Sequence, residues 1–371
     1  MKPAARLAGM GVTPIRVVSE GAPPDAMPLG LGEPTWPMAE EARVALAKFS
    51  GVCSYGPQVG MLDLRKAVAA YSGVAADDVV ITNGTQEALF DLCQAYLDPG
   101  DLVLVPDPGF VGYHGVIRLA GAKVVPYALD EARGFDLDAA AFVAALDAHP
   151  TAKMAIIGHP ANPTGGGASI DAYRTVAAAC EKRGVCLISD EVYRELYLAD
   201  RPPSLLDVSR YGFVVSSMSK GFGVPGLRIG WVIGKPEDLA PVKVIHGYAI
   251  TSVARPAQAA GVALFEAADR VLEASRVELR ARWQALEESM SSELGRKIRK
   301  PAGAFYHFLR LPDQAHADPM AHCLRMRDEA KVVVIPGIAF GERGRAYARL
   351  SFAALPEQIR EGVRRIARFW R

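Results

Sequence analysis

Short apolar runs alternate with longer amphipathic segments through the first two thirds of the chain. The apolar runs are rich in Val and Ile, which favours buried strands, and the segments between them have the apolar spacing of helices. Strands are predicted at 78–82, 102–105, 123–127, 154–158, 185–189, 213–215 and 228–233, with helices at 87–96, 110–119, 137–146 and 170–183. This alternation predicts an α/β fold with a mainly parallel seven-stranded sheet covered by helices.

The flanking segments have different patterns. Residues 1–28 are rich in Gly, Pro and Ala, which predicts an extended arm, and helices follow at 40–49 and 62–71. Residues 254–294 read as helical and are expected to bridge two domains. Beyond them, a smaller α+β unit is predicted from strands at 304–311, 332–335 and 348–352 and helices at 319–330 and 356–369. We therefore expect an arm (1–38) packing on a small domain (263–371), and a large domain (39–262) between them in sequence.

Composition narrows the class of protein. The 371 residues are 50% hydrophobic and 22% charged, an ordinary globular mixture, and the net charge of +1 makes no electrostatic case for nucleic acid or an anionic membrane. No apolar run reaches signal-peptide or membrane length, so we expect a cytoplasmic protein. Five scattered cysteines without a Cys-x-x-Cys pair predict neither a metal site nor a disulfide framework: Cys53, Cys93, Cys180, Cys186 and Cys323.

The segment Ser216-Ser217-Met218-Ser219-Lys220 follows the strand predicted at 213–215, and Arg228 returns eight residues later. A deprotonated lysine amine is a good nucleophile towards aldehydes. Neighbouring hydroxyls and a guanidinium suit a phosphate group. Together these residues suggest a Schiff-base lysine beside the phosphate of pyridoxal phosphate.

Three other interpretations of this segment compete. Gly221-x-Gly223-x-x-Gly226 matches a dinucleotide fingerprint, but Pro225 and the following strand oppose the helix which that motif should open. Ser217-x-x-Lys220 matches serine acyl-transferases, yet their Ser-Asp-Asn and Lys-Thr-Gly partners are absent from the sequence. Taken alone, the segment would fit a surface turn with a solvated lysine equally well, so the rest of the chain must decide.

Candidate polar and aromatic residues recur just after predicted strands. Gly84–Gln86 forms a Gly-containing turn that opens a helix, and such a turn is a ready anion site. Phe110, Asn162, Asp190 and Lys220 occupy comparable places after other strands. Because ligands of open parallel sheets bind beyond the carboxyl ends of the strands, this shared placement predicts one common site.

Three motifs in order carry a family resemblance: Asn162-Pro163-Thr164-Gly165, Ser189-Asp190-Glu191-Val192-Tyr193, and Ser217-Met218-Ser219-Lys220 followed by Arg228. With them the chain resembles the class I/II aminotransferases, which are fold-type I enzymes dependent on pyridoxal 5'-phosphate. The resemblance extends from Leu29-Gly-Leu-Gly-Glu-Pro to Arg349-Leu-Ser-Phe-Ala, nearly the whole chain.

The resemblance implies roles for the residues at matching positions. Lys220 would form the Schiff base and shuttle the proton, and Asp190 would keep the pyridine nitrogen protonated so that the ring acts as an electron sink. Tyr193 and Asn162 would donate to the ring hydroxyl. The remaining implied contacts are the phosphate ligands Gly84, Thr85, Gln86, Ser217, Ser219 and Arg228, the stacking Phe110, and Asn162, Arg349 and Gly32 for the substrate carboxylate.

The resemblance also implies a homodimer, in which Tyr55 reaches the phosphate of the neighbouring site. The reaction expected is transfer of an amino group from an L-amino acid to a 2-oxo acid. A carbon–sulfur lyase or a cyclopropane-forming synthase would use the same residues and stays an alternative. A cofactor-binding regulator is less expected, because only a short segment precedes Leu29 and the net charge is near zero.

Side-chain specificity stays open at this stage. A second cation for a distal carboxylate is conceivable at Lys48, Arg255 or His307. An aromatic or apolar side-chain site could be lined by Trp36, Tyr113 and Tyr306.

Overall fold

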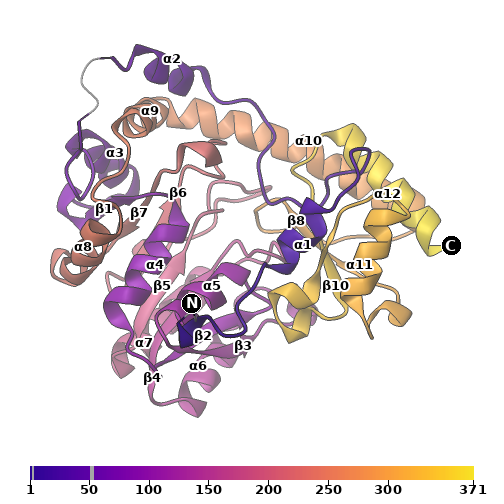
Figure 1. Ribbon diagram of the computed structural model, residues 1–371, viewed down its shortest axis with the longest axis horizontal. Helices are drawn as coiled ribbons and strands as arrows, with labels where there is room; N and C mark the ends of the chain where they lie inside the picture. Colours follow the sequence, from indigo (N-terminus) through magenta and orange to yellow (C-terminus); the bar gives the residue numbers. More distant parts are fainter. Residues whose placement is uncertain (2–3, 51–53) are drawn as a thin grey trace.

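The computed structural model describes residues 1, 4–50 and 54–371, so Cys53 lies outside the described residues. Its main feature is the predicted seven-stranded sheet, in the order β1-β7-β6-β5-β4-β2-β3 (Figure 1). Strands β2 to β6 pair in parallel, and only β7 runs antiparallel to its neighbours. The strands are β1 (Val79–Thr82), β2 (Leu102–Asp107), β3 (Lys123–Ala128), β4 (Ala152–Gly158), β5 (Cys186–Asp190), β6 (Phe213–Ser217) and β7 (Gly230–Ile233).

Helices cover both faces of this sheet because its strands are apolar on both sides. In β2, Val103 and Val105 pack with α4 (Thr85–Tyr96), α5 (Val111–Leu119) and α8 (Pro236–Ile250). Leu104 faces the opposite core, which contains α6 (Ala139–Ala148), α7 (Ile170–Arg183), α3 (Leu62–Ser72) and α9 (Arg255–Glu266). This period of two sends alternate side chains into two separate cores.

Helix α8 has no counterpart among the predicted elements. It contains Pro241 within its length, and Val244 and Tyr248 are exposed apolar residues on its surface. A proline and an apolar outer face both obscure the pattern expected of an amphipathic helix. Leu239, Val242 and the buried His246 nevertheless fix α8 against the sheet layer.

The smaller unit is built on a three-stranded antiparallel sheet in the order β8-β10-β9. Its strands are β8 (Tyr306–Arg310), β9 (Ile335–Pro336) and β10 (Tyr347–Ser351), with α11 (Pro319–Asp328) and α12 (Pro356–Trp370) packed around them. The strand predicted at 332–335 is largely wrong: Val332 makes an isolated bridge to Met27, and β9 begins only at Ile335.

Helix α10 (Ala268–Leu294) runs from the large sheet to the small one and packs along α12 (Figure 1). It begins directly after α9, so the helical stretch predicted at 254–294 is two helices joined at Ala267. Among the residues that the structure describes, no helix has the length and apolar character needed to cross a membrane.

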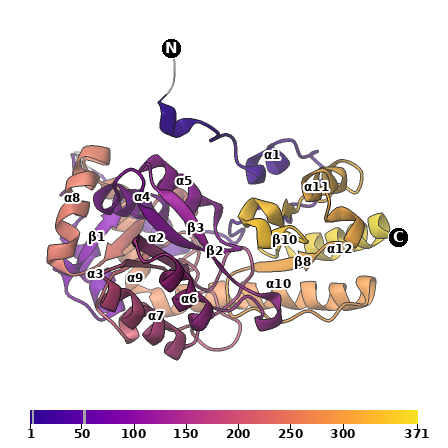
Figure 2. The same cartoon turned by 90° about the horizontal axis from the view of Figure 1, so that it is seen from below.

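The N-terminal segment is not simply extended, as the sequence suggested. Thr13 caps a short helix, α1 (Pro14–Glu20), that begins at a proline. Val18 on this helix is fully buried, and Arg327 of α11 donates to the Val17 carbonyl at 3.3 Å. Figure 2 shows α1 beside α11. Helix α2 (Glu40–Lys48) follows; the domain limits at 38 and 262 stay a prediction.

Candidate active site

A cavity of about 270 Å³ opens at the carboxyl ends of the parallel strands and continues to the small sheet. The two sheets and the segments around them supply its walls. All the predicted site residues line it except Gly84 and Tyr55: Gly32, Thr85, Gln86, Phe110, Asn162, Asp190, Tyr193, Ser217, Ser219, Lys220, Arg228 and Arg349. Residues separated by more than three hundred positions in the chain therefore meet in one place.

Lys220 lies just beyond β6 with its amine inside the cavity. Its Nζ donates to the carbonyl of Gly32 at 2.5 Å and lies 6.0 Å from the centre of the Tyr193 ring. Burial, reinforced by the nearby cation Arg349, lowers the pKa of the Lys220 ammonium to about 8. A useful fraction of the amine is thus unprotonated near neutral pH, the form that attacks a carbonyl.

Asp190 ends the neighbouring strand β5 and is buried at the base of the cavity. Burial raises the pKa of this carboxyl to about 6, although hydrogen bonds from the Val192 N–H and from Tyr113 oppose the shift. The Tyr113 hydroxyl donates to Asp190 Oδ2 at 2.9 Å. Such a carboxylate is suited to hold a cationic N–H against the cavity wall.

Tyr113 lines the cavity, as the sequence analysis considered, and its hydroxyl has a further contact. That hydroxyl donates to Asp190 and so supports the carboxylate. Its ring meets that of Phe110 edge to face at 5.4 Å. Phe110 immediately precedes α5 and Tyr113 lies in its first turn, so the two rings are close in sequence as well as in space.

The opposite end of the cavity is suited to a phosphate. The Thr85 hydroxyl is buried without a hydrogen-bond partner at the N-terminus of α4, where free N–H groups and the helix dipole favour an anion. Ser217 and Ser219 line the same end. Gly84 packs behind it: a Cβ there would stand 2.5 Å from Nη2 of Arg228, so glycine lets the guanidinium approach the turn.

Arg228 lies two residues before strand β7, whereas the sequence analysis placed it at the start of that strand. It has a left-handed backbone with φ 56°, and β7 starts at Gly230, so the strand predicted at 228–233 is two residues too long. This conformation turns the side chain back towards the α4 turn, where Nη2 donates to the Asn83 carbonyl at 2.9 Å.

Arg349 lies on β10, the central strand of the small sheet, and is buried. Nη1 donates to Asn162 Oδ1 at 2.9 Å and Nη2 to the Gly30 carbonyl at 2.6 Å. Its Nε is buried without a partner in the described chain. A fixed guanidinium at the cavity wall is suited to hold a carboxylate.

The cations considered for a second carboxylate lie elsewhere. Lys48 is exposed at the end of α2, and Arg255 donates to the Ser54 hydroxyl at 2.6 Å. His307 lines a separate cavity, and burial lowers its pKa to about 4. Trp36 packs against Phe305. Of the aromatic residues considered, Tyr306 and Tyr113 do line the active-site cavity.

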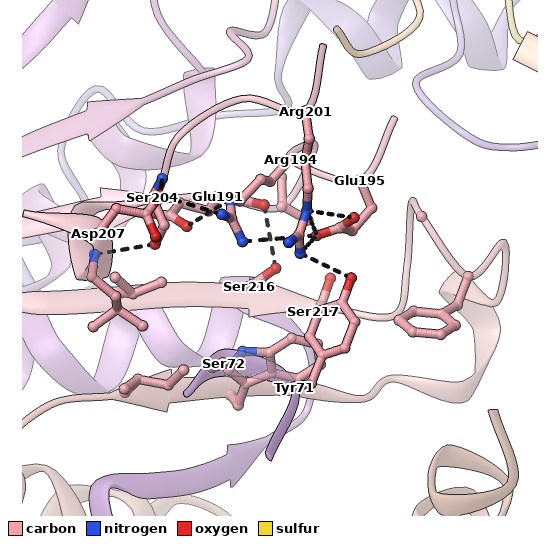
Figure 3. Close-up of a pocket in the computed structure, with 17 residues that line it drawn as sticks. Tyr71, Ser72, Glu191, Arg194, Glu195, Arg201, Ser204, Asp207, Ser216 and Ser217 are labelled. Atoms are coloured by element: carbon pink, nitrogen blue, oxygen red, sulfur yellow. Dashed lines mark hydrogen bonds and ion pairs between the residues drawn. The ribbon is translucent and has the colours of Figure 1, made fainter. Parts of the chain in front are cut away.

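A second cavity, of about 130 Å³, lies beside the first and shares Val192 and Ser217 with it (Figure 3). Glu191 points into it, and its carboxylate accepts from Ser189 Oγ at 2.9 Å and from the Leu205 N–H at 2.8 Å. Its arginines are paired: Arg194 with Asp207, and Arg201 with Glu195. We interpret this network as support for the turn that carries Asp190.

A polar cluster that the sequence analysis missed lies behind the phosphate end. His246 Nδ1 is 3.1 Å from Asp91 Oδ2 and 3.8 Å from Glu87 Oε1, and burial raises the pKa of both carboxyls. Glu87 also accepts from the Asn83 N–H. Within the described ranges, this is the one group whose side chains have the types and spacing for a metal ion. It joins α8 to the α4 turn.

Comparison with known proteins identifies the family. The family model "Aminotransferase class I and II" matches residues 24–366, nearly the entire chain. The protein belongs to this family and is an aminotransferase, as the three sequence motifs indicated.

Individual relatives agree with this assignment over most of their length. An aspartate/prephenate aminotransferase of Thermus thermophilus is 31% identical, with 99% of this chain and 96% of that protein covered. A probable N-acetyl-LL-diaminopimelate aminotransferase of Bacillus subtilis is 31% identical over 93% of this chain and 89% of its own. The solved aspartate aminotransferase from Thermus thermophilus with maleate superposes with a TM-score of 0.91 at 28% identity, covering 99% of both chains. The fold-type I architecture is thereby confirmed.

Proposed function

We propose that the protein moves an amino group from an L-amino acid to a 2-oxo acid with pyridoxal 5'-phosphate held on Lys220. The observation that carries this proposal is the placement of two residues in one cavity: Asp190 at the end of β5 and Lys220 just beyond the adjacent parallel strand β6. When bound, the cofactor supplies an electron sink for the carbanion formed at the substrate α-carbon. Every other step depends on groups of this chain.

The base of the cavity handles protons. The Lys220 amine, with its lowered pKa, would take the proton from the substrate α-carbon and deliver it to a carbon of the cofactor. Asp190 would hold the proton of the pyridine nitrogen, and Tyr113 would keep the carboxylate in place. Tyr193 and Asn162 would donate to the cofactor's ring oxygen.

The walls orient the two ligands. Thr85, Gln86, Ser217, Ser219 and Arg228 would hold the phosphate, with Gly84 behind them, and Phe110 would stack on the ring. Arg349 and Asn162, already hydrogen-bonded to each other, would bind the substrate α-carboxylate beside Gly32. Binding of the α-carboxylate determines which bond at the α-carbon breaks, because the bound carboxylate and the amine together set the orientation of the α-carbon.

The residues that line the cavity bear on the identity of the amino donor. In the described part of this chain, the cations that line the cavity are Lys220, Arg228 and Arg349, and each has a role above. Ile15 of α1 and Leu89 add apolar surface. We therefore keep a broad choice of donor, although two of the relatives compared are named for aspartate.

We further propose a cytoplasmic homodimer that binds neither nucleic acid nor membrane. Tyr55 is 84% exposed and lies outside the cavity of its own chain, which is consistent with a place in the site of a second copy. The net charge of +1 offers no basis for attraction to a polyanion.

The test is a visible absorption spectrum of the purified protein with added pyridoxal 5'-phosphate, before and after a panel of L-amino acids. We expect a lysine-dependent band in the parent that some amino acids convert to the pyridoxamine form. Lys220→Ala should lack the band, and the exposed Lys48→Ala should keep it.

Two other outcomes have distinct meanings. A band that forms and never converts would favour a lyase, a synthase or a sensor, because the same residues would serve those chemistries. A band that survives Lys220→Ala would refute the role of this lysine.

A further inference from the structure

On the basis of the proposed function, we propose that Tyr306 is a positioning residue: its hydroxyl donates to Tyr193 and thereby leaves the Tyr193 proton for the cofactor's ring oxygen. Tyr306 begins β8 of the small sheet, whereas Tyr193 follows β5 of the large sheet. The contact joins the two units at the reacting end of the cavity, which both tyrosines line.

The two hydroxyls form a close pair in a dry environment. Their oxygens are 2.6 Å apart, the rings meet edge to face at 5.5 Å, and both side chains are buried. The Tyr306 hydroxyl makes this hydrogen bond within the described chain. A hydrogen bond inside a low-dielectric site is stronger and more directional than one exposed to water.

The direction of donation follows from the neighbours. Burial raises the pKa of Tyr306, and the Arg349 guanidinium, which lies over the Tyr306 ring at 4.6 Å from its centre, limits that rise. Burial raises the pKa of Tyr193 well above its ordinary value, and Tyr306 adds to that rise. The hydroxyl nearer the cation is the better donor, so Tyr306 donates and Tyr193 accepts.

Tyrosine has one hydroxyl proton, so this direction determines what Tyr193 can do. If Tyr193 donated to Tyr306, no proton would be left for a ligand. With Tyr306 as donor, the Tyr193 proton points away from Tyr306. The accepted bond also polarises Tyr193 and makes it a stronger donor to a third oxygen.

The backbone at Gly32 holds this arrangement in place. A Cβ added at Gly32 would overlap the Tyr306 hydroxyl, and the Gly32 carbonyl accepts from Lys220 Nζ at 2.5 Å. Gly32 therefore contacts both the positioning hydroxyl and the reactive amine. Gly32 was predicted to lie beside the substrate carboxylate. Its contact with the Tyr306 hydroxyl is a second role, and this role requires a residue without a side chain.

The experiment compares Tyr306→Phe with Tyr347→Phe. Tyr347 is a second buried tyrosine of the small sheet, and its hydroxyl donates to Glu131 at 2.5 Å, away from the active site. Both changes remove one hydrogen-bonded hydroxyl and keep the ring, including the surface on which Arg349 rests in the case of Tyr306. The readout is the pH midpoint at which the visible band of the lysine-bound cofactor changes.

We expect the midpoint to rise by about 0.5 to 1 pH unit in Tyr306→Phe, the size of one neutral hydrogen bond expressed as proton affinity. Without Tyr306, Tyr193 stabilises the anionic ring oxygen less, so the proton shared with the lysine nitrogen is held more tightly. The cofactor dissociation constant should stay within about twofold, and kcat should fall more than KM rises. Gly32→Ala, which crowds the same hydroxyl, should shift the midpoint in the same direction.

An unchanged midpoint in Tyr306→Phe would overturn the inference, and so would an equal shift in Tyr347→Phe, because that would mark general loosening of the small sheet. A parent protein without the lysine-dependent band would instead overturn the proposed function, and this inference with it. Circular dichroism of each variant confirms that the comparison is made between folded proteins.

Discussion

Lys220 and Asp190 show how burial alone tunes a catalytic pair. Burial disfavours both charged forms, so it lowers the pKa of the lysine to about 8 and raises that of the aspartate to about 6. The two shifts bring a base and an acid towards neutral pH, where proton transfer is most efficient. A bound cofactor with a cationic ring nitrogen would restore the charge on Asp190.

The raised pKa of Asp190 has a measurable consequence for the cofactor-free protein. Between about pH 4 and pH 6 the folded state binds a proton that the unfolded state has lost, so the aspartate's contribution to stability falls as the pH rises. Relative to Asp190→Asn, the parent should lose roughly 3 kcal/mol of unfolding free energy across this window. Urea unfolding at several pH values measures it.

Asp190→Asn is itself the control for that experiment, since its amide does not titrate. A difference in stability between the two proteins that stays constant from pH 4 to pH 6 would contradict the prediction.

At the scale of elements, the turn before α4 depends on a neighbour that the sequence did not reveal. Glu87 accepts from the Asn83 N–H, and the Asn83 carbonyl accepts from Arg228 at 2.9 Å. Asp91 and His246, hydrogen-bonded at 3.1 Å, pack behind Glu87 and connect α4 to α8. The phosphate end is therefore braced from behind by a buried polar cluster.

Replacing Glu87 with Ala should weaken cofactor binding. The change removes the acceptor for the Asn83 N–H and frees the turn to which Arg228 is bound, so we expect the dissociation constant for pyridoxal 5'-phosphate to rise about tenfold. Glu87→Gln should lose less, because its amide oxygen still accepts from Asn83. Titration of the cofactor-free protein measures both constants.

Glu237→Ala is the matched control, since Glu237 is an exposed glutamate in the first turn of α8. If the Glu87→Ala protein bound the cofactor as tightly as the parent, Glu87 would not contribute to cofactor binding, which would contradict the prediction.

At the scale of the whole molecule, the site needs both sheets. Asp190 and Lys220 follow strands of the large sheet, and Arg349 and Tyr306 lie on the small one. The outer surface of the large unit carries exposed apolar residues on α8, with Tyr248 93% and Val244 55% exposed. Gln58, in the loop of Tyr55, donates to the Lys243 carbonyl of the same helix, so Tyr55 and α8 belong to one surface.

We expect this surface to form the homodimer. Sedimentation velocity at micromolar concentration should give twice the chain mass of 39.7 kDa. Tyr248→Asp should shift the protein towards the monomer, because burying an unpaired carboxylate in an interface is costly. Activity should fall with it if Tyr55 serves the neighbouring site.

Val277→Asp is the control for an exposed apolar residue elsewhere, since Val277 is 52% exposed on α10. A parent that sediments as a monomer, or a Tyr248→Asp protein that stays a dimer, would place the interface elsewhere or exclude it.

Much of this protein could be predicted from its sequence because the relevant signals are local. Apolar runs rich in Val and Ile mark most of the seven strands, and Asp190 and Lys220 can be recognised because each comes shortly after such a run. Elements without a clean period were missed: α1 is short, and α8 contains Pro241 and exposes apolar residues. A helix is recognised in a sequence by one apolar face, and that signal is weak in a helix that also exposes apolar residues.

The sequence predicted a common site, but only the tertiary structure decided which side chains form hydrogen bonds with one another. Arg349 bonds Asn162 across 187 positions, Tyr193 meets Tyr306 across 113, and Tyr113 reaches Asp190 across 77. No pattern in the chain encodes such distances, because they depend on how the helices and the two sheets pack. The same packing removes water from Lys220 and Asp190, so their pKa shifts belong to the folded molecule and not to the residues.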